Sequence, residues 1–171
     1  MSDTSFSLPL KDADHTRAAG AAIGHALLTT RVEGPLIIHL NGDLGAGKTT
    51  LIGGMLNAMG FVGAVRSPTY TLVEPYEFMR DMTPSAPLQV MHMDLYRLTD
   101  ASQLDELGVR DMLVPDTVLL IEWPDRAEDR LPFADVAINL AYPESGASGR
   151  TLQIVAHAPQ AKQLLTSVQW Q

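Results

Sequence analysis

The sequence contains no cysteine. Disulfides, cysteine nucleophiles and thiolate metal ligands are therefore excluded, and a reducing compartment is permitted. The chain also lacks an apolar run approaching the roughly 18 residues needed to span a membrane. Its first residues, MSDTSFSLPLKD, have no apolar centre of the kind found in signal peptides. We therefore expect a cytoplasmic protein without a membrane anchor.

Positive charge is also scarce. Twelve lysines and arginines face 20 acidic residues, which gives a formal net charge of −8 and argues against broad nucleic-acid or membrane-surface binding. Any role with a nucleic acid would need a local patch or a partner protein. The 171 residues are 46% hydrophobic, enough for a sizeable core, and show no repeat or linker. We expect one domain over residues 1–171.

The most informative stretch is Gly42 to Thr49, read as GDLGAGKT. It matches the phosphate-binding pattern GxxxxGK[ST]. The apolar run 36–40 before it has the length of a strand, and residues 49–59 after it carry apolar side chains at helical spacing. A glycine turn with a solvated lysine is the alternative, and it is disfavoured because strand and helix flank the motif.

The residue types in this loop suit a polyphosphate. Glycines let the backbone fold closely around phosphates with its N–H groups inward, and the helix N-terminus adds partial positive charge. Lys48 would reach the β- and γ-phosphates, and the Thr49 hydroxyl would take a place on Mg²⁺. The residues predicted to contact nucleotide here are Asp43, Leu44, Gly45, Ala46, Gly47, Lys48, Thr49 and Thr50.

Adenine is the expected base. The segment DELG at 105–108 formally matches the DxxG motif of guanine-nucleotide switches, but it lies within a helical pattern. The chain also lacks the NKxD motif that reads guanine. A helix from Asp12 or Asp14 to about Leu28 leads towards the loop, so Asp12 and Thr16 are candidates for a base contact, with helix capping the favoured alternative.

Two apolar strand candidates, 88–93 and 117–121, end in Asp94 and Glu122. Open α/β sheets bind ligands at the carboxyl ends of their strands. Two carboxylates together with Thr49 could hold magnesium and position an attacking water, and the pattern leaves open which carboxylate touches the metal. His92 shares a strand face with Asp94; a structural histidine is favoured there over a proton carrier.

The remaining segments complete an α/β pattern. Residues 66–71 carry hydroxyls at Ser67 and Thr69 that could sense a γ-phosphate or form an ordinary loop. We expect a strand over 70–73, an exposed loop over 77–87, and a helix over 101–113 capped by Asp100. Segments 136–142 and 151–155 predict antiparallel strands closing the sheet, followed by a helix over 160–168. For Arg150, at the start of the second of these strands, solvent is favoured over a nucleotide contact.

Five segments are informative when taken together: NGDLGAGKTT (41–50), SPTYTLVEPY (67–76), HMDLYRL (92–98), LGVRD (107–111) and IEWP (121–124). In this order they resemble the bacterial TsaE family, formerly YjeE, ATPases of the tRNA threonylcarbamoyladenosine system. Methionine at 93, where the family often has phenylalanine, and a longer loop over 77–87 are minor departures. The C-terminal third matches only weakly.

The resemblance implies a three-layer α/β P-loop NTPase-like domain with a mixed, mainly parallel sheet, which binds ATP with Mg²⁺. It also implies work with TsaB and TsaD, which threonylcarbamoylate the adenosine next to the anticodon, so that tRNA is contacted through partners. Thr49 and Glu122 look like magnesium ligands, Ser67 to Thr69 like a switch near the γ-phosphate, and Asp94 like a residue needed for hydrolysis.

The expected catalytic set is thus Lys48, Thr69, Asp94 and Glu122, in an ATPase that is slow until partners complete its site. Two alternatives remain at this point. A small-molecule P-loop kinase is disfavoured because the chain has no arginine cluster for a lid. A nucleotide-gated binding module would bind ATP without meaningful turnover.

Overall fold

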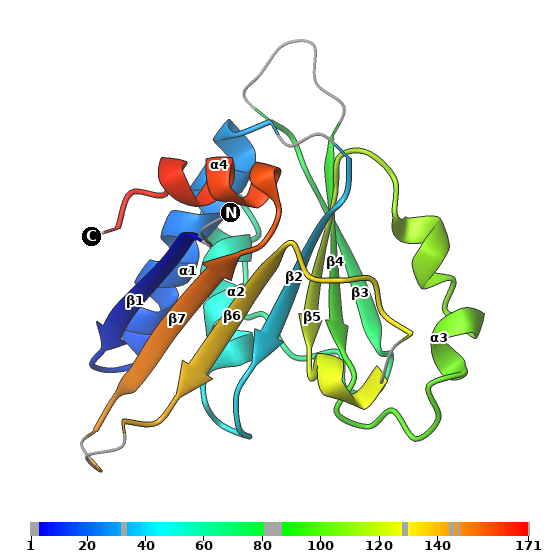
Figure 1. Ribbon diagram of the computed structural model, residues 1–171, viewed down its shortest axis with the longest axis horizontal. Helices are drawn as coiled ribbons and strands as arrows, with labels where there is room; N and C mark the ends of the chain where they lie inside the picture. Colours follow the sequence, from blue (N-terminus) through cyan, green and yellow to red (C-terminus); the bar gives the residue numbers. More distant parts are fainter. Residues whose placement is uncertain are drawn as a thin grey trace.

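A mixed sheet of seven strands forms the centre of the computed structural model, which describes residues 4–31, 34–80, 87–127, 130–143, 146 and 148–170 (Figure 1). The strand order is β1-β7-β6-β2-β5-β4-β3. The four strands β6, β2, β5 and β4 run parallel, and the pairings outside them are antiparallel. The strands are β1 Thr4–Leu10, β2 Leu36–Asn41, β3 Val73–Phe78, β4 Leu88–Asp94, β5 Thr117–Glu122, β6 Val136–Ala141 and β7 Arg150–Ala156.

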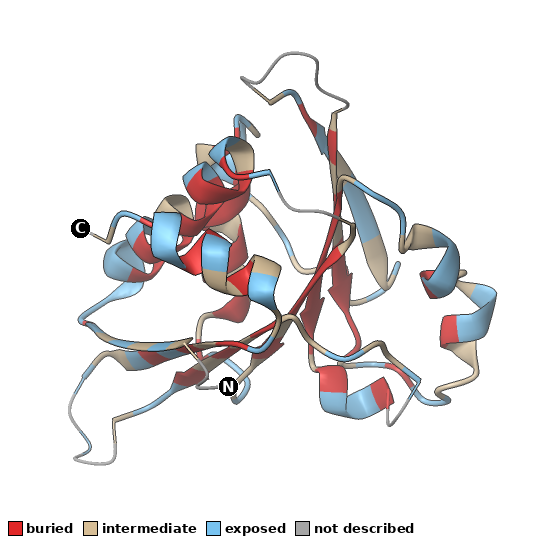
Figure 2. Ribbon diagram, turned by 45° about the horizontal axis from the view of Figure 1, so that its top comes forward, coloured by how far each residue is buried: buried red, intermediate tan, exposed pale blue. Residues whose placement is uncertain are grey.

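Helices cover this sheet on both sides, which makes three layers (Figures 1 and 2). One side carries α1 Ala13–Thr29, α2 Lys48–Ala58 and α4 Pro159–Ser167; the other carries α3 Gln103–Glu106 and the 3₁₀ turns η1 Val109–Met112 and η2 Pro124–Ala127. Strand β2 shows the alternation that such layers require. Leu36, Ile38 and Leu40 join the core under α1, α2 and α4, whereas Ile37 joins the core on the other face. The predicted three-layer α/β architecture with a mixed sheet is confirmed.

Helices α1 and α2 pack through glycines. A Cβ atom on Gly20 would lie 2.1 Å from the Leu51 carbonyl oxygen, and one on Gly54 would lie 2.2 Å from the Arg17 carbonyl oxygen. Real Cβ atoms do not approach backbone atoms so closely, so only glycine permits this helix spacing. The contact fixes α2, whose first turn carries Lys48 and Thr49, against the N-terminal helix.

The strand predicted over 70–73 is wrong in position. Strand β3 begins at Val73, because Leu72 adopts φ 64° and its N–H donates to the Pro68 carbonyl in a turn. The loop predicted over 77–87 is wrong at its start, since Glu77 and Phe78 belong to β3; residues 81–86 lie outside the described residues.

The long helix predicted over 101–113 is also wrong. Gly108 has φ 67° and divides the segment into α3 and η1, so the helical hydrogen-bonding pattern stops there. The helices predicted near residues 12–28, 49–59 and 160–168 are confirmed as α1, α2 and α4. None of the described helices combines the length and apolar character required to cross a bilayer.

Strand β1 was not predicted. Its register with β7 is antiparallel, and Phe6 and Leu8 alternate with the exposed Ser5, Ser7 and Pro9. The predicted antiparallel pairing of β6 and β7 is confirmed, but this pair does not close the sheet. Strand β1 does so, and its proline is tolerated because an edge strand pairs on one side only.

Candidate functional site

The phosphate-binding pattern forms a tight connection between β2 and α2. Gly42 has φ 146°, and a Cβ atom there would lie 2.4 Å from the Leu140 carbonyl oxygen of β6. Gly47 adopts φ 108° at the N-cap of α2. These two glycines allow the chain to leave a buried parallel strand and enter a helix within a few residues, as the sequence predicts.

Lys48 is buried inside this connection. Its Nζ atom donates to the carbonyl oxygens of Gly42 at 2.5 Å and Asp43 at 3.0 Å, and lies 3.9 Å from the centre of the Trp123 ring. Burial lowers the pKa of Lys48, and the negative charges of Glu122, Asp94 and Asp43 oppose that shift. Trp123 has φ 58°, a backbone conformation that costs a bulky residue about 1–3 kcal/mol and is typical of functional sites.

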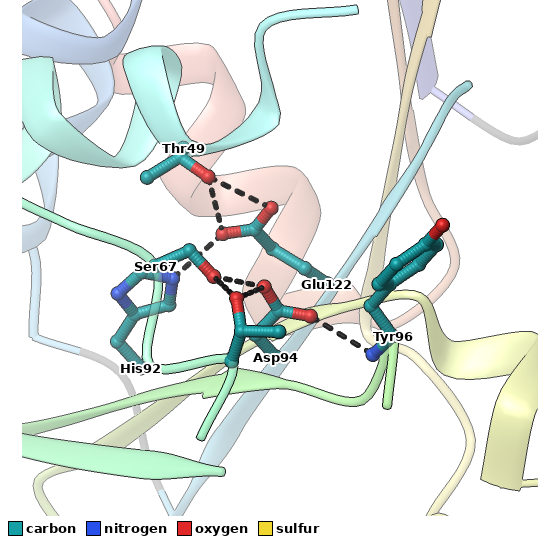
Figure 3. A network of polar contacts seen from close by, with 7 residues as sticks. Thr49, Ser67, His92, Asp94, Tyr96 and Glu122 are labelled. Carbon is teal, nitrogen blue, oxygen red and sulfur yellow. Dashed lines mark hydrogen bonds and ion pairs between the residues drawn. The ribbon is translucent and has the colours of Figure 1, made fainter. Parts of the chain in front are cut away.

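Glu122 lies at the centre of a buried polar cluster (Figure 3). The Thr49 hydroxyl donates to both of its carboxylate oxygens, at 2.9 and 3.0 Å, and His92 Nε2 lies 2.8 Å from Oε1. Glu122 ends β5 directly beside Asp94 at the end of β4, because the two parallel strands are in register there. The predicted convergence of two strand-end carboxylates with Thr49 is therefore what the structure shows.

Asp94 is held by the segment that follows α2 (Figure 3). Its Oδ2 atom accepts hydrogen bonds from the hydroxyls of Ser67 and of Thr69, the latter at 3.1 Å, and its Oδ1 accepts from the Tyr96 N–H at 2.9 Å. The two hydroxyls also lie 2.8 Å apart. The polar segment is thus an organised part of the site in contact with the strand-end carboxylate.

A cavity of about 260 Å³ lies over these groups. Its lining joins the predicted loop residues to both strand ends: Leu44, Gly45, Gly47, Lys48, Thr49, Thr50, Ser67, Thr69, Asp94, Tyr96, Glu122 and Trp123. Asp43 is not among them; its carbonyl oxygen instead accepts from Lys48 and from the Ala46 N–H at 3.0 Å. The main chain of Asp43 therefore stabilises the conformation of the loop.

A second cavity, of about 230 Å³, lies on the other side of the loop. Thr16, Lys11, Asp12, Ala46 and Arg150 are among its lining residues, and it shares Gly45, Gly47 and Thr50 with the first. Thr16 is buried and its hydroxyl donates to the Asp12 carbonyl oxygen, while the Asp12 carboxylate accepts from the His15 N–H at 2.9 Å. The capping role favoured for Asp12 is confirmed.

Two contacts of the site were missed from the sequence. His92 was predicted to be structural, and its ring indeed touches Glu122 rather than the cavity. For Arg150, solvent was favoured over a nucleotide contact; the half-buried side chain also donates to the carbonyl oxygens of Gly45 and Ala46, each at 3.2 Å, which was not predicted. No local sequence signal could have shown this, because the contact depends on the position of β7 relative to a loop about a hundred residues earlier.

The donor atoms suit magnesium. The Thr49 hydroxyl and the Glu122 carboxylate are oxygen ligands, the type that Mg²⁺ prefers, and they already lie within hydrogen-bonding distance of each other. Among the described residues, no three histidine, cysteine or acidic side chains form a self-sufficient metal cluster. The fit to magnesium therefore rests on the oxygens of Thr49 and Glu122 alone.

The fold and this site define the class. A parallel strand, a glycine-rich loop with a buried lysine, a helix, and two strand-end carboxylates make this a three-layer α/β protein whose β2–α2 connection has the sequence pattern of a phosphate-binding loop. Over residues 10–152 the chain matches the protein family described as threonylcarbamoyl adenosine biosynthesis protein TsaE. The chain belongs to the TsaE family.

Individual relatives agree with this assignment. The chain is 38% identical over 148 residues to the tRNA threonylcarbamoyladenosine biosynthesis protein TsaE of Haemophilus influenzae, covering 86% of this chain and 87% of that protein. It is 31% identical to the TsaE of Treponema pallidum, covering 76% and 87%. The crystal structure of Bacillus subtilis YdiB has the same fold, with a TM-score of 0.73 and 23% identity over 98% of this chain and 96% of that one.

Proposed function

We propose that this protein binds Mg-ATP, hydrolyses it slowly on its own, and thereby supports TsaB and TsaD in the threonylcarbamoylation of tRNA. The observation that carries the proposal is Lys48, buried in a glycine-rich loop beside the hydrogen-bonded pair of Thr49 and Glu122. Family membership supports the tRNA modification as the process that this nucleotide site serves.

Phosphate binding follows from the loop. On entry of a triphosphate, Lys48 exchanges the carbonyl oxygens of Gly42 and Asp43 for phosphate oxygens, which are stronger acceptors because they are charged. The N-terminus of α2 adds favourable dipole potential. We infer that the ribose and adenine would enter the second cavity, which is bordered by Lys11 and Thr16 and shares loop residues with the first.

Hydrolysis needs a positioned water and neutralised charge. Thr49 and Glu122 would hold magnesium, which bridges phosphate oxygens and neutralises the charge that develops during transfer. Asp94 lies beside Glu122 and lines the same cavity, so its carboxylate can orient a water molecule towards the γ-phosphate.

The contacts of Asp94 support the proposal that ATP turnover by the free protein is slow. Its Oδ2 atom is already occupied by the Ser67 and Thr69 hydroxyls. With the Tyr96 N–H on Oδ1, three of the roughly four acceptor positions of this carboxylate are taken, so a water molecule competes with these groups for Asp94. A partner that moves the segment 67–69 would therefore accelerate hydrolysis, as expected for a protein that acts within a complex.

The cellular experiment measures threonylcarbamoyladenosine in bulk tRNA from cells depleted of this protein. Rescue by the wild type and not by Lys48→Ala would link the phosphate loop to the modification. Unchanged nucleoside levels in depleted cells without a redundant copy would refute the assignment, and phosphorylation of a metabolite panel would then revive the kinase alternative.

A second pair of variants separates hydrolysis from binding. Asp94→Ala and Glu122→Ala are expected to lose both ATPase activity and cellular function. Full rescue by variants that have no ATPase activity would instead favour the nucleotide-gated binding module.

A further inference from the structure

Arg150 occupies a fixed position at the start of β7. The preceding residue, Gly149, has φ 103°, and a Cβ atom there would lie 2.5 Å from the Leu10 carbonyl oxygen at the end of β1. Because only glycine tolerates both this backbone conformation and this approach, the start of β7 is locked against β1. The backbone position of Arg150 is therefore fixed.

The guanidinium group of Arg150 binds main-chain carbonyls of the phosphate loop. Its Nε donates to the Ala46 oxygen and its Nη2 to the Gly45 oxygen, each at 3.2 Å, while Nη1 donates to Gly149 at 2.6 Å. The group also lies 3.9 Å from the centre of the Tyr142 ring, within cation–π distance. The planar fork of arginine suits two adjacent carbonyls, which a lysine ammonium could not span in the same way.

Peptide geometry gives these contacts a consequence for the loop. In a trans peptide the C=O and N–H bonds point in opposite directions. With the Ala46 oxygen held by Arg150, the N–H of Gly47 in the same peptide points away from Arg150, and Gly47 lines the cavity that contains Lys48 and Glu122. A cation on the carbonyl also polarises the peptide, which strengthens its N–H as a donor.

We propose that Arg150 is a positioning residue that holds the phosphate loop in its nucleotide-binding shape by binding the Gly45 and Ala46 carbonyls from outside. The fixed conformation of the loop depends only on contacts within the protein. The effect of Arg150 on nucleotide affinity rests on the proposed function. Arg150 thereby couples the β6–β7 half of the sheet to the site on β2, β4 and β5.

The test compares Arg150→Gln and Arg150→Lys with Arg130→Gln. Arg130 forms an ion pair with Asp105 outside the cavities around the loop, so its variant is a matched control for the loss of one positive charge. Hydrogen exchange of the loop amides in the nucleotide-free protein is the first measurement, and binding of a fluorescent ADP is the second. Thermal unfolding of each variant verifies that the chain is folded.

We expect Arg150→Gln to raise exchange of the amides in 42–49 and to weaken ADP binding, each by about tenfold, with Arg130→Gln unchanged. Arg150→Lys should resemble Arg150→Gln in exchange, because it keeps the charge but loses the fork. Weaker ADP binding with unchanged exchange in the free protein would overturn the inference, since it would indicate a direct ligand contact. Unchanged exchange and binding would overturn it as well. If the wild type bound no nucleotide, the proposed function would fail, while the exchange comparison would still decide the role of Arg150.

Discussion

His92 shows how a single buried side chain can serve a site without facing the cavity. A carboxylate only accepts hydrogen bonds, so the contact with Glu122 assigns the proton to Nε2 of the fully buried His92. The other ring nitrogen, Nδ1, is buried without a hydrogen-bond partner in the described part of the chain. A buried polar atom without a partner destabilises a protein by about 1–3 kcal/mol, so the hydrogen bond to Glu122 is the contact that offsets the burial of this ring.

Because His92 contacts Glu122, we expect its replacement to weaken the proposed magnesium binding. The side-chain amide of glutamine can substitute for Nε2, whereas asparagine is too short to reach Glu122. We expect His92→Asn to raise the magnesium concentration needed for half-maximal nucleotide binding by about tenfold, and His92→Gln to change it much less.

The matched measurement is nucleotide binding in the presence of a chelator, which should be nearly equal for the two variants. If the asparagine and glutamine variants had the same magnesium dependence, the hydrogen bond to Glu122 would have no positioning role.

His39 provides a pH-dependent contribution to stability. Burial lowers its pKa from the ordinary value of 6.5, and a hydrogen bond with the main chain of Pro132 opposes the shift. The unfolded chain thus binds a proton at a higher pH than the folded protein does. Stability from the neutral ring is present above about pH 6.5 and is lost as the pH falls below that value towards the folded-state pKa.

We predict that His39→Leu makes the free energy of unfolding less sensitive to pH between about 7.5 and 5.5. Urea unfolding at the two pH values measures this, with the exposed His25 as the site of a control variant, His25→Gln. An equally steep acid loss in wild type and His39→Leu would assign the pH dependence to other groups.

At the scale of elements, the glycines between α1 and α2 are the most sensitive positions. A Cβ atom on Gly54 would meet the Arg17 carbonyl oxygen at 2.2 Å, so alanine there must push two helices apart. Gly53, the neighbouring residue in α2, would meet only the Val65 Cβ atom at 3.7 Å, an ordinary contact.

We expect Gly54→Ala to destabilise the protein by more than about 2 kcal/mol. Gly53→Ala should instead be neutral or stabilising by up to about 1 kcal/mol, because alanine favours a helix. Chemical unfolding of both variants measures the difference. A similar loss of stability in both would mean that helix spacing does not depend on the glycine contact.

Elements with strong local patterns were predictable from the sequence. The buried parallel strands β2, β4 and β5 and the helix α2 have continuous or periodic apolar residues, and Asp94 and Glu122 at the strand ends followed from that pattern. Strand β1 was missed because three of its seven residues are polar and its partner, β7, lies far away in the sequence. The break at Gly108 was missed because apolar spacing continues across it, although the backbone does not stay helical.

The site shows the same division. Lys48 and Thr49 could be predicted because their place at the start of α2 depends on the neighbouring loop residues. Arg150 was misjudged because its contact with the Gly45 and Ala46 carbonyls depends on how β7 is placed in the sheet. Contacts that depend on the pairing of strands far apart in the sequence could therefore not be predicted from residue types alone.

On the scale of the whole molecule, the two halves of the sheet contribute different residues to the site. The carboxyl ends of β2, β5 and β4 carry the loop and the two acidic residues, and the antiparallel strands β7 and β1 place Arg150 behind the loop. We therefore expect changes in the C-terminal half to alter the proposed nucleotide binding without touching the cavity that contains Lys48. The order of strands in the sheet thus brings Arg150 next to Gly45 and Ala46, which lie about a hundred residues earlier in the sequence.

The overall charge limits what the molecule can bind directly. The chain has a formal net charge of −8, and three of its arginines, Arg17, Arg80 and Arg130, form ion pairs with aspartates. A tRNA phosphate backbone is attracted by clustered free cations, and its affinity falls with salt as bound counterions are released.

We therefore predict that the isolated protein binds tRNA more weakly than about 100 μM at roughly 0.15 M salt. Fluorescence anisotropy with labelled tRNA, repeated at lower salt, measures this affinity. A dissociation constant of a few micromolar that weakens steeply with salt would reveal a local basic patch and contradict the prediction. Weak binding by the isolated chain, with tRNA retained once the proposed partners are added, would mean that the nucleotide site acts on the tRNA only through the complex.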